Sequence, residues 1–219
     1  PSSAQTAYYC NEMNVRKRQV ICDLSKAAVT LQAGAMQWTA GNVNATTGLK
    51  GVGDLFGKAV RGKVTGESAI KPEYTGDGIL VTEPTYRYIL LEDLNDWNGS
   101  IVLDDGLFLA SEASVKHKAV MRSNFSSAVA GGEGLFNLGL TGAGIVCLES
   151  NSPREELIEI TMQNDVVKID GNMAIAWSGS LEFTVERSGK TLLGSAASGE
   201  GLVNVYRGTG KVLLAPVAR

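Results

Sequence analysis

The chain contains few side chains of the kinds that carry out acid–base or metal chemistry. Its single histidine, His117, lies between two lysines in the alternating run Ser114–Lys118, which is typical of a strand with one face in water. We expect His117 to face solvent rather than to act as a general base. The three cysteines, Cys10, Cys22 and Cys147, form with His117 no pair at the two-to-four-residue spacing of structural zinc sites.

Two other patterns match catalytic motifs only in part. Residues 57–64 have the spacing of a phosphate-binding loop, but Val64 stands where a serine or threonine would hold magnesium, and no hydrophobic strand leads into the loop. The acid pairs Asp104-Asp105 and Glu155-Glu156 are adjacent in the chain, and neighbours in a strand point to opposite faces. The sequence therefore predicts no catalytic residue, no cofactor and no metal, and a protein that is not an enzyme.

Three glutamates recur at regular intervals and are the first candidate site. Glu67, Glu133 and Glu200 lie 66 and 67 residues apart, each beside a glycine. Three acids at equivalent places in a pseudo-threefold body would form a ring on the surface of the repeated loops. Alternatively, each carboxylate accepts hydrogen bonds from the backbone amides of its own glycine turn, which every copy of the fold would need.

Composition indicates the class of structure that holds these residues. Glycine makes up 26 of the 219 residues, well above the usual share of about 7%, and short runs rich in Val, Ile, Leu and Thr lie between the glycines. Such a pattern favours strands joined by tight turns, and hence an all-β protein.

Charge and cysteine usage limit the partners and the compartment. The net charge is −3 and no large basic block is present, so nucleic acid is an unfavoured partner. An odd number of irregularly spaced cysteines suits buried thiols in a reducing compartment, and no apolar stretch approaches the 18 residues of a membrane helix. We expect a cytoplasmic protein.

An internal repeat of about 67 residues organises the chain. Glu67, Glu133 and Glu200 are each followed after eight or nine residues by a Gly-x-Gly pair and an apolar run. A second marker, formed by Trp38, Ala110 and Trp177, keeps the same order, and we expect these three residues to be equivalent and both tryptophans to anchor the core. The sequence predicts one compact domain, 1–219, of three β-sandwich or double-stranded β-helix-like subdomains in pseudo-threefold arrangement, with repeats at 20–98, 99–165 and 166–219.

The repeated motifs resemble a known family. Ala35-Met36-Gln37-Trp38, Ala174-Ile175-Ala176-Trp177 and Gly199–Asn204 are similar to the signatures of the TRAP-like proteins grouped with the mitochondrial-biogenesis factor called altered inheritance of mitochondria, from about residue 20 to the C-terminus. The resemblance implies three similar β-subdomains in one chain, related to the tryptophan RNA-binding attenuation protein only in shape. It brings no catalytic residues. Bacterial members carry no assigned activity, and mitochondrial members are linked to inner-membrane organisation. One extra residue separates the glutamate from Gly-x-Gly in the first two repeats.

The first repeat carries an insertion that is the second candidate site. Trp38 precedes Glu67 by 29 residues, whereas the same interval is 23 residues in the other repeats. The inserted stretch, 48–66, departs from β alternation and places apolar residues on one helical face beside basic ones, among them Leu55, Phe56, Lys58 and Arg61. It is expected to pack on its own body or on a neighbouring subunit, to contact an anionic membrane peripherally, or to form a mobile loop.

These observations favour a non-catalytic interaction or scaffold protein, expected to form a homo-oligomer and to bind an unidentified protein partner. The alternative is a small-ligand binding protein that uses clefts between the repeats.

Overall fold

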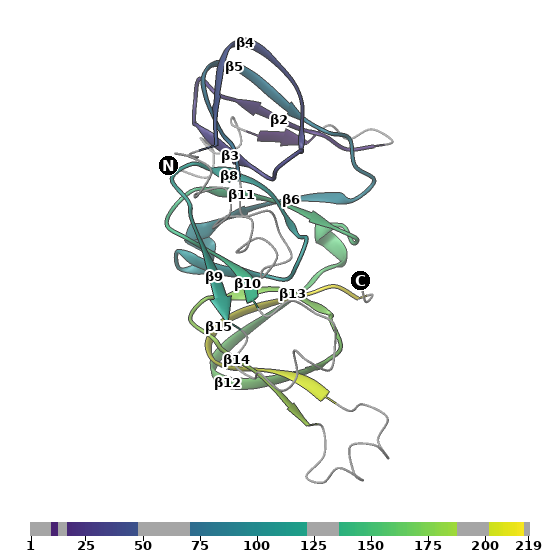
Figure 1. Ribbon diagram of the computed structural model, residues 1–219. Coiled ribbons are helices and arrows are strands. Elements are labelled where there is room, and N and C mark those ends of the chain that lie inside the picture. The colour runs from purple at the N-terminus through teal and green to yellow at the C-terminus, as the bar shows by residue number, and fades with distance from the viewer. Residues whose placement is uncertain (1–9, 13–16, 48–70, 122–135, 188–201, 217–219) are drawn as a thin grey trace.

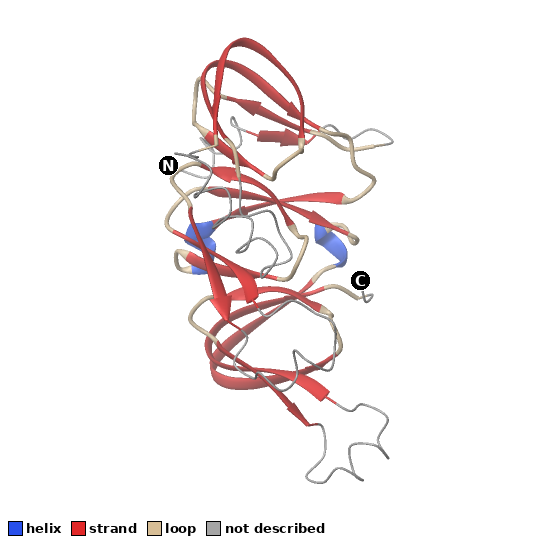
Figure 2. Ribbon diagram, viewed as in Figure 1, coloured by secondary structure: helices blue, strands red, loops and turns tan. Residues whose placement is uncertain are grey.

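Strands are the predominant secondary structure of the residues that the structure describes. The computed structural model describes residues 10–12, 17–47, 71–121, 136–187 and 202–216, and the only helices among them are the short 3-10 turns η1 (Leu94–Trp97) and η2 (Arg154–Glu156). Figure 2 shows strands from one end of the molecule to the other. The predicted all-β class is confirmed.

The strands form two curled antiparallel sheets. The first has the order β1-β2-β5-β3-β8-β11-β6, with β4 paired to β5, and the second has the order β12-β15-β13-β7-β10-β9, with β14 paired to β15. The strands are β1 (Cys10–Glu12), β2 (Val20–Asp23), β3 (Val29–Leu31), β4 (Met36–Thr46), β5 (Glu73–Thr82), β6 (Tyr88–Asp93), β7 (Ser100–Leu103), β8 (Phe108–Glu112), β9 (Lys116–Met121), β10 (Phe136–Thr141), β11 (Ile145–Ser150), β12 (Ile158–Asp170), β13 (Ala174–Ser178), β14 (Glu182–Arg187) and β15 (Leu202–Leu214).

The same set of strand pairings occurs three times. In unit 2, formed by β6 to β11, β11 lies between β6 and β8, and β10 lies between β7 and β9. Unit 1, formed by β2 to β5, has the same pattern with fewer, longer strands. Its β4 corresponds to both β8 and β9 of unit 2, and its β5 corresponds to both β10 and β11. Unit 3, β12 to β15, merges β6 and β7 into β12 and the last two strands into β15. The three units are therefore sandwich-like subdomains of one design.

The three units lie in a row along the long axis of the molecule (Figure 1). The units therefore follow one another in a column. As strand pairing defines them, unit 2 begins with β6, which pairs with β11, and unit 3 begins with β12, which pairs with β15.

One kind of junction joins each unit to the next. Strand β3 of unit 1 pairs with β8 of unit 2, and β7 of unit 2 pairs with β13 of unit 3, both antiparallel. The Cα partners are Val29–Glu112, Thr30–Ser111 and Leu31–Ala110 at the first junction and Ile101–Ser178, Val102–Trp177 and Leu103–Ala176 at the second.

Each of the first two cores is closed by the following unit. The core of unit 1 includes Leu109, Ala110, Ile145 and Cys147 of unit 2. The core of unit 2 in turn includes four residues of unit 3, which are Ile175, Ala176, Leu213 and Ala215. Because apolar surface is buried across each junction, the units stabilise one another as neighbours in a repeat protein do.

The two tryptophans of the repeat differ from the prediction. Trp177 is 3% exposed and lies in the core of unit 3, as expected, but Trp38 is 47% exposed and anchors no core. Trp38 and Ala110 pair with the third residue after their Gly-x-Gly, Val81 and Cys147, and so are equivalent. Trp177 instead pairs with Val212, the second residue, and Ala176 pairs with the third, Leu213, so the residue equivalent to Trp38 and Ala110 is Ala176.

Candidate functional site

Strand β4 forms an open end of the column. It pairs with β5 along its whole length, and every residue of β4 except the half-buried Val43 is exposed. Figure 1 shows β4 and β5 at the end of the molecule farthest from unit 3. Among the described strands, none pairs with the other edge of Met36–Ala40, the edge that β8 and β13 use at the two junctions.

The exposure of Trp38 follows from its place in the repeat. The equivalent residues of the other units, Ala110 and Ala176, are both 0% exposed, because each packs into the core of the unit before it. Among the described residues no unit packs on this side of unit 1, and Trp38 at the same position is 47% exposed. Ile79 shows the same difference in exposure. It is 41% exposed, whereas its equivalent in unit 2, Ile145, is 6% exposed.

Trp38 and Ile79 together make an apolar surface. Trp38 pairs with Val81, and Ala40 pairs with Ile79. Paired residues and residues two positions apart share a face, so Trp38 and Ile79 lie on the same face of the β4–β5 ladder. Met36, at the start of β4, is 38% exposed and pairs with Thr82, so its side chain lies on the opposite face. We call the surface formed by Trp38 and Ile79, with the edge of Met36–Ala40 that no described strand pairs with, the unit 1 end face.

Glycines hold β4 close against β5 beyond this face. Gly41 has φ of 90° and Gly76 has φ of 125°, values that favour glycine. A Cβ on Gly76 would collide with the carbonyl oxygen of Asn42, and one on Gly41 would lie 2.7 Å from the carbonyl oxygen of Asp77. The close approach of β4 and β5 therefore requires glycine at both positions.

His117 is not solvent-facing, which corrects the prediction from its lysine neighbours. Its ring packs edge-on against Phe108, with ring centroids 4.9 Å apart, and its Nε2 lies 3.0 Å from Oγ of Ser111. Burial, with a smaller contribution from the charge of Lys71, lowers the pKa of His117 to about 4. The imidazole is therefore neutral at pH 7.

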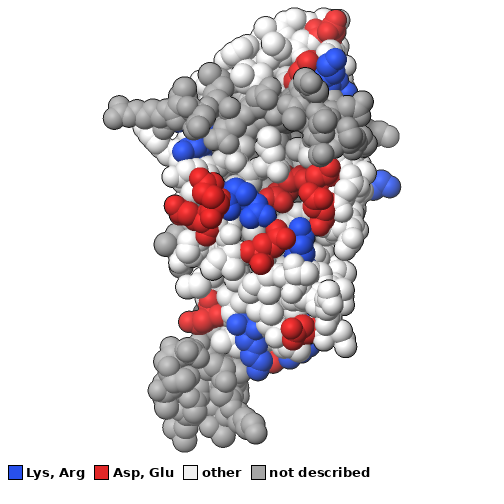
Figure 3. Space-filling model, turned by 180° about the vertical axis from the view of Figure 1, so that it is seen from behind, with Lys and Arg blue, Asp and Glu red and all other residues white. Residues whose placement is uncertain are grey.

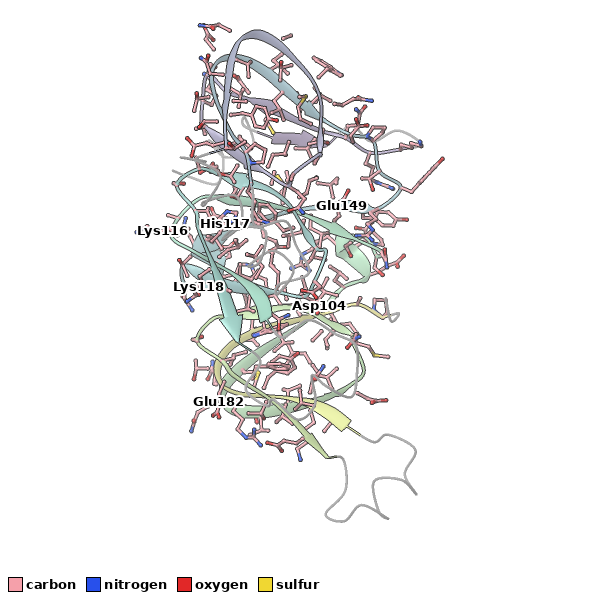
Figure 4. All side chains as sticks on the ribbon, in the orientation of Figure 1. Asp104, Lys116, His117, Lys118, Glu149 and Glu182 are labelled. Atoms are coloured by element: carbon pink, nitrogen blue, oxygen red, sulfur yellow. The ribbon has the colours of Figure 1, made fainter. Side chains whose placement is uncertain are left out.

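The contact between Ser111 and His117 lacks the features of a nucleophile and its base. Ser111 is 2% exposed, so a substrate carbonyl has no path to its hydroxyl. The other ring nitrogen, Nδ1, is buried without a hydrogen-bond partner, so no third group orients the ring. In Figure 4, the labelled acids Asp104, Glu149 and Glu182 lie well away from His117.

A small cavity lies where unit 2 meets unit 3. It has a volume of about 110 Å³, and its wall includes Trp177 and Phe183 from unit 3 and Lys118 and Asn137 from unit 2. The amide nitrogen of Asn137 donates to the carbonyl oxygen of Leu103 at 3.1 Å. Cavities that hold drug-sized ligands are about 300–1,000 Å³, so this one admits only a few atoms.

Charged side chains of both signs lie side by side on the back of the molecule, and Figure 3 shows no broad area of one sign there. Ion pairs connect units 2 and 3: Arg154 lies 3.3 Å from Glu92 and 2.8 Å from Glu159. Glu92 also accepts a hydrogen bond from the indole nitrogen of Trp97 at 3.0 Å. The ammonium of Lys211 lies 4.5 Å from the centre of the same indole ring. This network is structural, since its charges neutralise one another.

The residues proposed as sites from the sequence lie outside the described residues. They are Glu67, Glu133 and Glu200 of the repeated loops, and Leu55, Phe56, Lys58 and Arg61 of the insertion. Of the other candidates, Cys22 and Cys147 are buried, Asp104 and Asp105 are half-buried beside the turn after β7, and Glu155 and Glu156 are exposed in η2. Within the described ranges, no three His, Cys, Asp or Glu side chains come together as metal ligands.

Comparison with known proteins decides the family. The model of the family described as mitochondrial biogenesis AIM24 matches residues 13–217. This chain belongs to the AIM24 family. An uncharacterized protein of Streptococcus pyogenes serotype M6 is similar to this AIM24 family member, with 32% identity over 195 residues that cover 85% of this chain and 76% of that protein.

The fold of this AIM24 family member is also that of a solved structure. The crystal structure of a Streptococcus pyogenes protein matches 95% of this chain and 93% of that one, with a TM-score of 0.70 and 29% identity. In the part of the chain that the structure describes, no helix is long and apolar enough to cross a membrane.

The unit 1 end face was missed from the sequence, although a signal for it was present. The repeat alignment sets Trp38 against Ala110, and a large aromatic residue where another copy has alanine indicates a different environment. The absence of any charge from Met36–Thr46 is a second signal, because edge strands usually carry charges that prevent pairing.

Proposed function

We propose that this AIM24 family member is a non-catalytic interaction protein that binds a protein partner through the unit 1 end face. The observation that carries the proposal is the exposure of Trp38 beside a strand edge with which no described strand pairs. A strand edge offers backbone donors and acceptors to a partner strand, and exposed apolar side chains beside it supply buried area. Tryptophan is among the residue types that contribute most to binding at protein interfaces.

The other features support this proposal over catalysis. The histidine is neutral and half-buried, and its neighbour Ser111 lies where a substrate cannot reach it. The charges between units 2 and 3 neutralise one another and connect the units.

Binding of a small ligand at the cavity between units 2 and 3 is the second candidate. Two aromatic rings and the Lys118 ammonium in its wall favour it, and its volume of about 110 Å³ limits it to a ligand of a few atoms. A crystal structure determined after soaking with small anions such as formate or nitrate would test it, and a cavity that stays without the anion would exclude this class of ligand.

Binding of a protein partner through the unit 1 end face is tested by replacing one side chain at each end of the molecule. Trp38→Asp places a charge on the unit 1 end face, and Val166→Asp places one at a site of similar exposure, 48%, on β12 of unit 3. Tagged wild-type and variant chains are used to isolate bound proteins, which are quantified by mass spectrometry. We expect Trp38→Asp to lose a protein, or a second untagged copy of the chain, that the wild type and Val166→Asp both retain.

Amide hydrogen exchange gives an independent measurement. The protein that is lost is added back in purified form to the wild-type chain, and protection should appear at Met36–Ala40. An identical set of bound proteins for all three chains would refute the proposed function.

A further inference from the structure

We infer that the occupant of the unit 1 end face is the same face of a second copy, with β4 paired antiparallel to β4 across a two-fold axis. This inference rests on the proposed function and names its partner. It predicts a closed dimer in which the first sheet of each copy continues into the first sheet of the other.

The edge used for this pairing already joins strands elsewhere in the chain. At both junctions, the strand that corresponds to Met36–Ala40 accepts an antiparallel neighbour on this edge. The backbone geometry of the repeat is thus compatible with a partner strand there. In unit 1 that place is left open by the described strands, and its side chains are exposed.

The composition of β4 suits pairing with itself. When a strand pairs with its own copy across a two-fold axis, any charge it carries lies near the identical charge of the partner, which is destabilising. Strand β4, Met-Gln-Trp-Thr-Ala-Gly-Asn-Val-Asn-Ala-Thr, has no charged residue and no proline in 11 residues. The other three strands of ten residues or more all carry charges, among them Asp77 of β5, Lys168 of β12 and Arg207 of β15.

The opposite end of the column explains why the partner is not the third unit of another copy. Continuing the column head to tail would use the edge of β12 that corresponds to β3 and β7. Lys168 occupies the place that Thr30 and Val102 hold in those strands, because each of the three pairs with the residue three positions before its Gly-x-Gly, namely Val205, Glu73 and Gly139. Val102 is 4% exposed and Thr30 is half-buried, whereas Lys168 is exposed. A lysine at this position, with Asp165 and Asp170 on the same strand, opposes further strand addition.

Two-fold pairing also gives the apolar side chains a partner. Trp38 lies near the middle of Met36–Ala40, so the two indole rings of the dimer would lie close to the axis. Ile79 of each copy would lie on the same face as Trp38 and extend the apolar contact. Head-to-tail addition would instead produce open filaments, which two-fold closure avoids.

Opposite charges introduced at Thr39 test the inference directly. Thr39 is exposed, and across a two-fold axis near Trp38 the two copies of residue 39 lie within reach of long side chains. Thr39→Lys and Thr39→Asp each set like charges against one another, whereas a mixture of the two sets opposite charges. Mass is measured by sedimentation equilibrium on the full chain, and circular dichroism confirms that each variant is folded.

We expect the wild type to form a dimer of about 46 kDa, twice the chain mass of 23.1 kDa. Each Thr39 variant alone should dimerise at least about tenfold more weakly, and an equimolar mixture should recover the wild-type dimer. Val166→Lys is the control at the other end of the column, and it should remain a dimer.

Three results would overturn the inference: a wild-type chain that is monomeric at every soluble concentration, a mixture of Thr39 variants that stays monomeric, or a Val166→Lys variant that loses the dimer. The proposed function fails separately. If the wild type is monomeric while Trp38→Asp still loses a bound protein, only the self-association is wrong. If the wild type is monomeric and Trp38→Asp loses nothing, both are wrong.

Discussion

His117 has the most perturbed environment of any ionisable side chain in the described chain. Its ring fits between Phe108 and Ser111, where a positive charge would lose its hydration and lie near Lys71. Burial and the neighbouring charge act in the same direction, since both disfavour the imidazolium. A neutral histidine in such a place serves packing, and it links the stability of the fold to pH.

We expect the free energy of unfolding to decrease as the pH is lowered, because of His117. The pKa of this residue is about 4 in the folded chain and 6.5 in the unfolded chain, so between these values the unfolded chain binds more protons. The stabilisation is complete above about pH 6.5, and roughly 3 kcal/mol should be lost as the pH falls to about 4. Urea unfolding of wild type and His117→Gln at several pH values measures the difference. An identical pH dependence in both proteins would show that the histidine is not responsible.

The two repeat tryptophans should respond differently to truncation. Trp177 lies 5.2 Å from Phe183 and 5.3 Å from Tyr206, measured between ring centroids, and replacing it with alanine should cost about 3–5 kcal/mol of unfolding free energy. Trp38→Ala removes a side chain that is 47% exposed and should cost less than about 1 kcal/mol in dilute protein. Denaturant unfolding of both variants tests this, and equal losses would contradict the assigned environments.

At the scale of the elements, strands β4 and β5 depend on close approach of their backbones. Gly76 and Gly34 both have positive φ, of 125° and 80°, but only at Gly76 would a Cβ collide with the opposite strand. Gly34→Ala should therefore cost only the conformational strain, about 1–2 kcal/mol, and Gly76→Ala should cost clearly more. Thermal unfolding of the two variants compares them. A Gly76→Ala protein as stable as Gly34→Ala would show that β4 can move away from β5.

The sequence predicted the positions of the strands better than the burial of their side chains. Alternating runs such as Leu181–Glu186 and Leu202–Tyr206 indicated strands; β14 contains the first run from Glu182 on, and β15 contains the second. The repeat spacing predicted three similar subdomains, because each copy keeps its Gly-x-Gly turn. Trp177 lies one position after Ala176, the residue equivalent to Trp38, and an offset of one residue could not be seen in the spacing of the glycines.

Burial could not be predicted where it depends on a distant part of the chain. His117 is flanked by lysines, a pattern typical of a surface strand, yet its ring is covered by Phe108 and lies near Lys71 of the preceding unit. Trp38 looked like a core residue because Trp177 was its counterpart, but whether its face is covered depends on the presence of a preceding unit. The candidate site therefore became visible only when the three units were compared in three dimensions.

At the scale of the whole molecule, shared cores couple neighbouring units. Ile175 of unit 3 lies in the core of unit 2, whereas Met162 lies in the core of unit 3. We expect Ile175→Ala to cost about 2–5 kcal/mol and to lower the hydrogen-exchange protection of β6 and β11 as well as that of unit 3. Met162→Ala should lower protection mainly in unit 3. Unchanged exchange of β6 and β11 in Ile175→Ala would show that the units are independent.

The two junctions within the column use one register, and this has a consequence for how such chains can change in length. Unit 2 receives β3 on one side and offers β7 on the other, with the same three positions paired at each junction. A tandem duplication of the segment that encodes unit 2 would place a new copy between matching neighbours, without a new kind of contact. Such a fold can therefore lengthen by duplication of its middle unit, while the two end units, which differ in their exposed side chains, are kept.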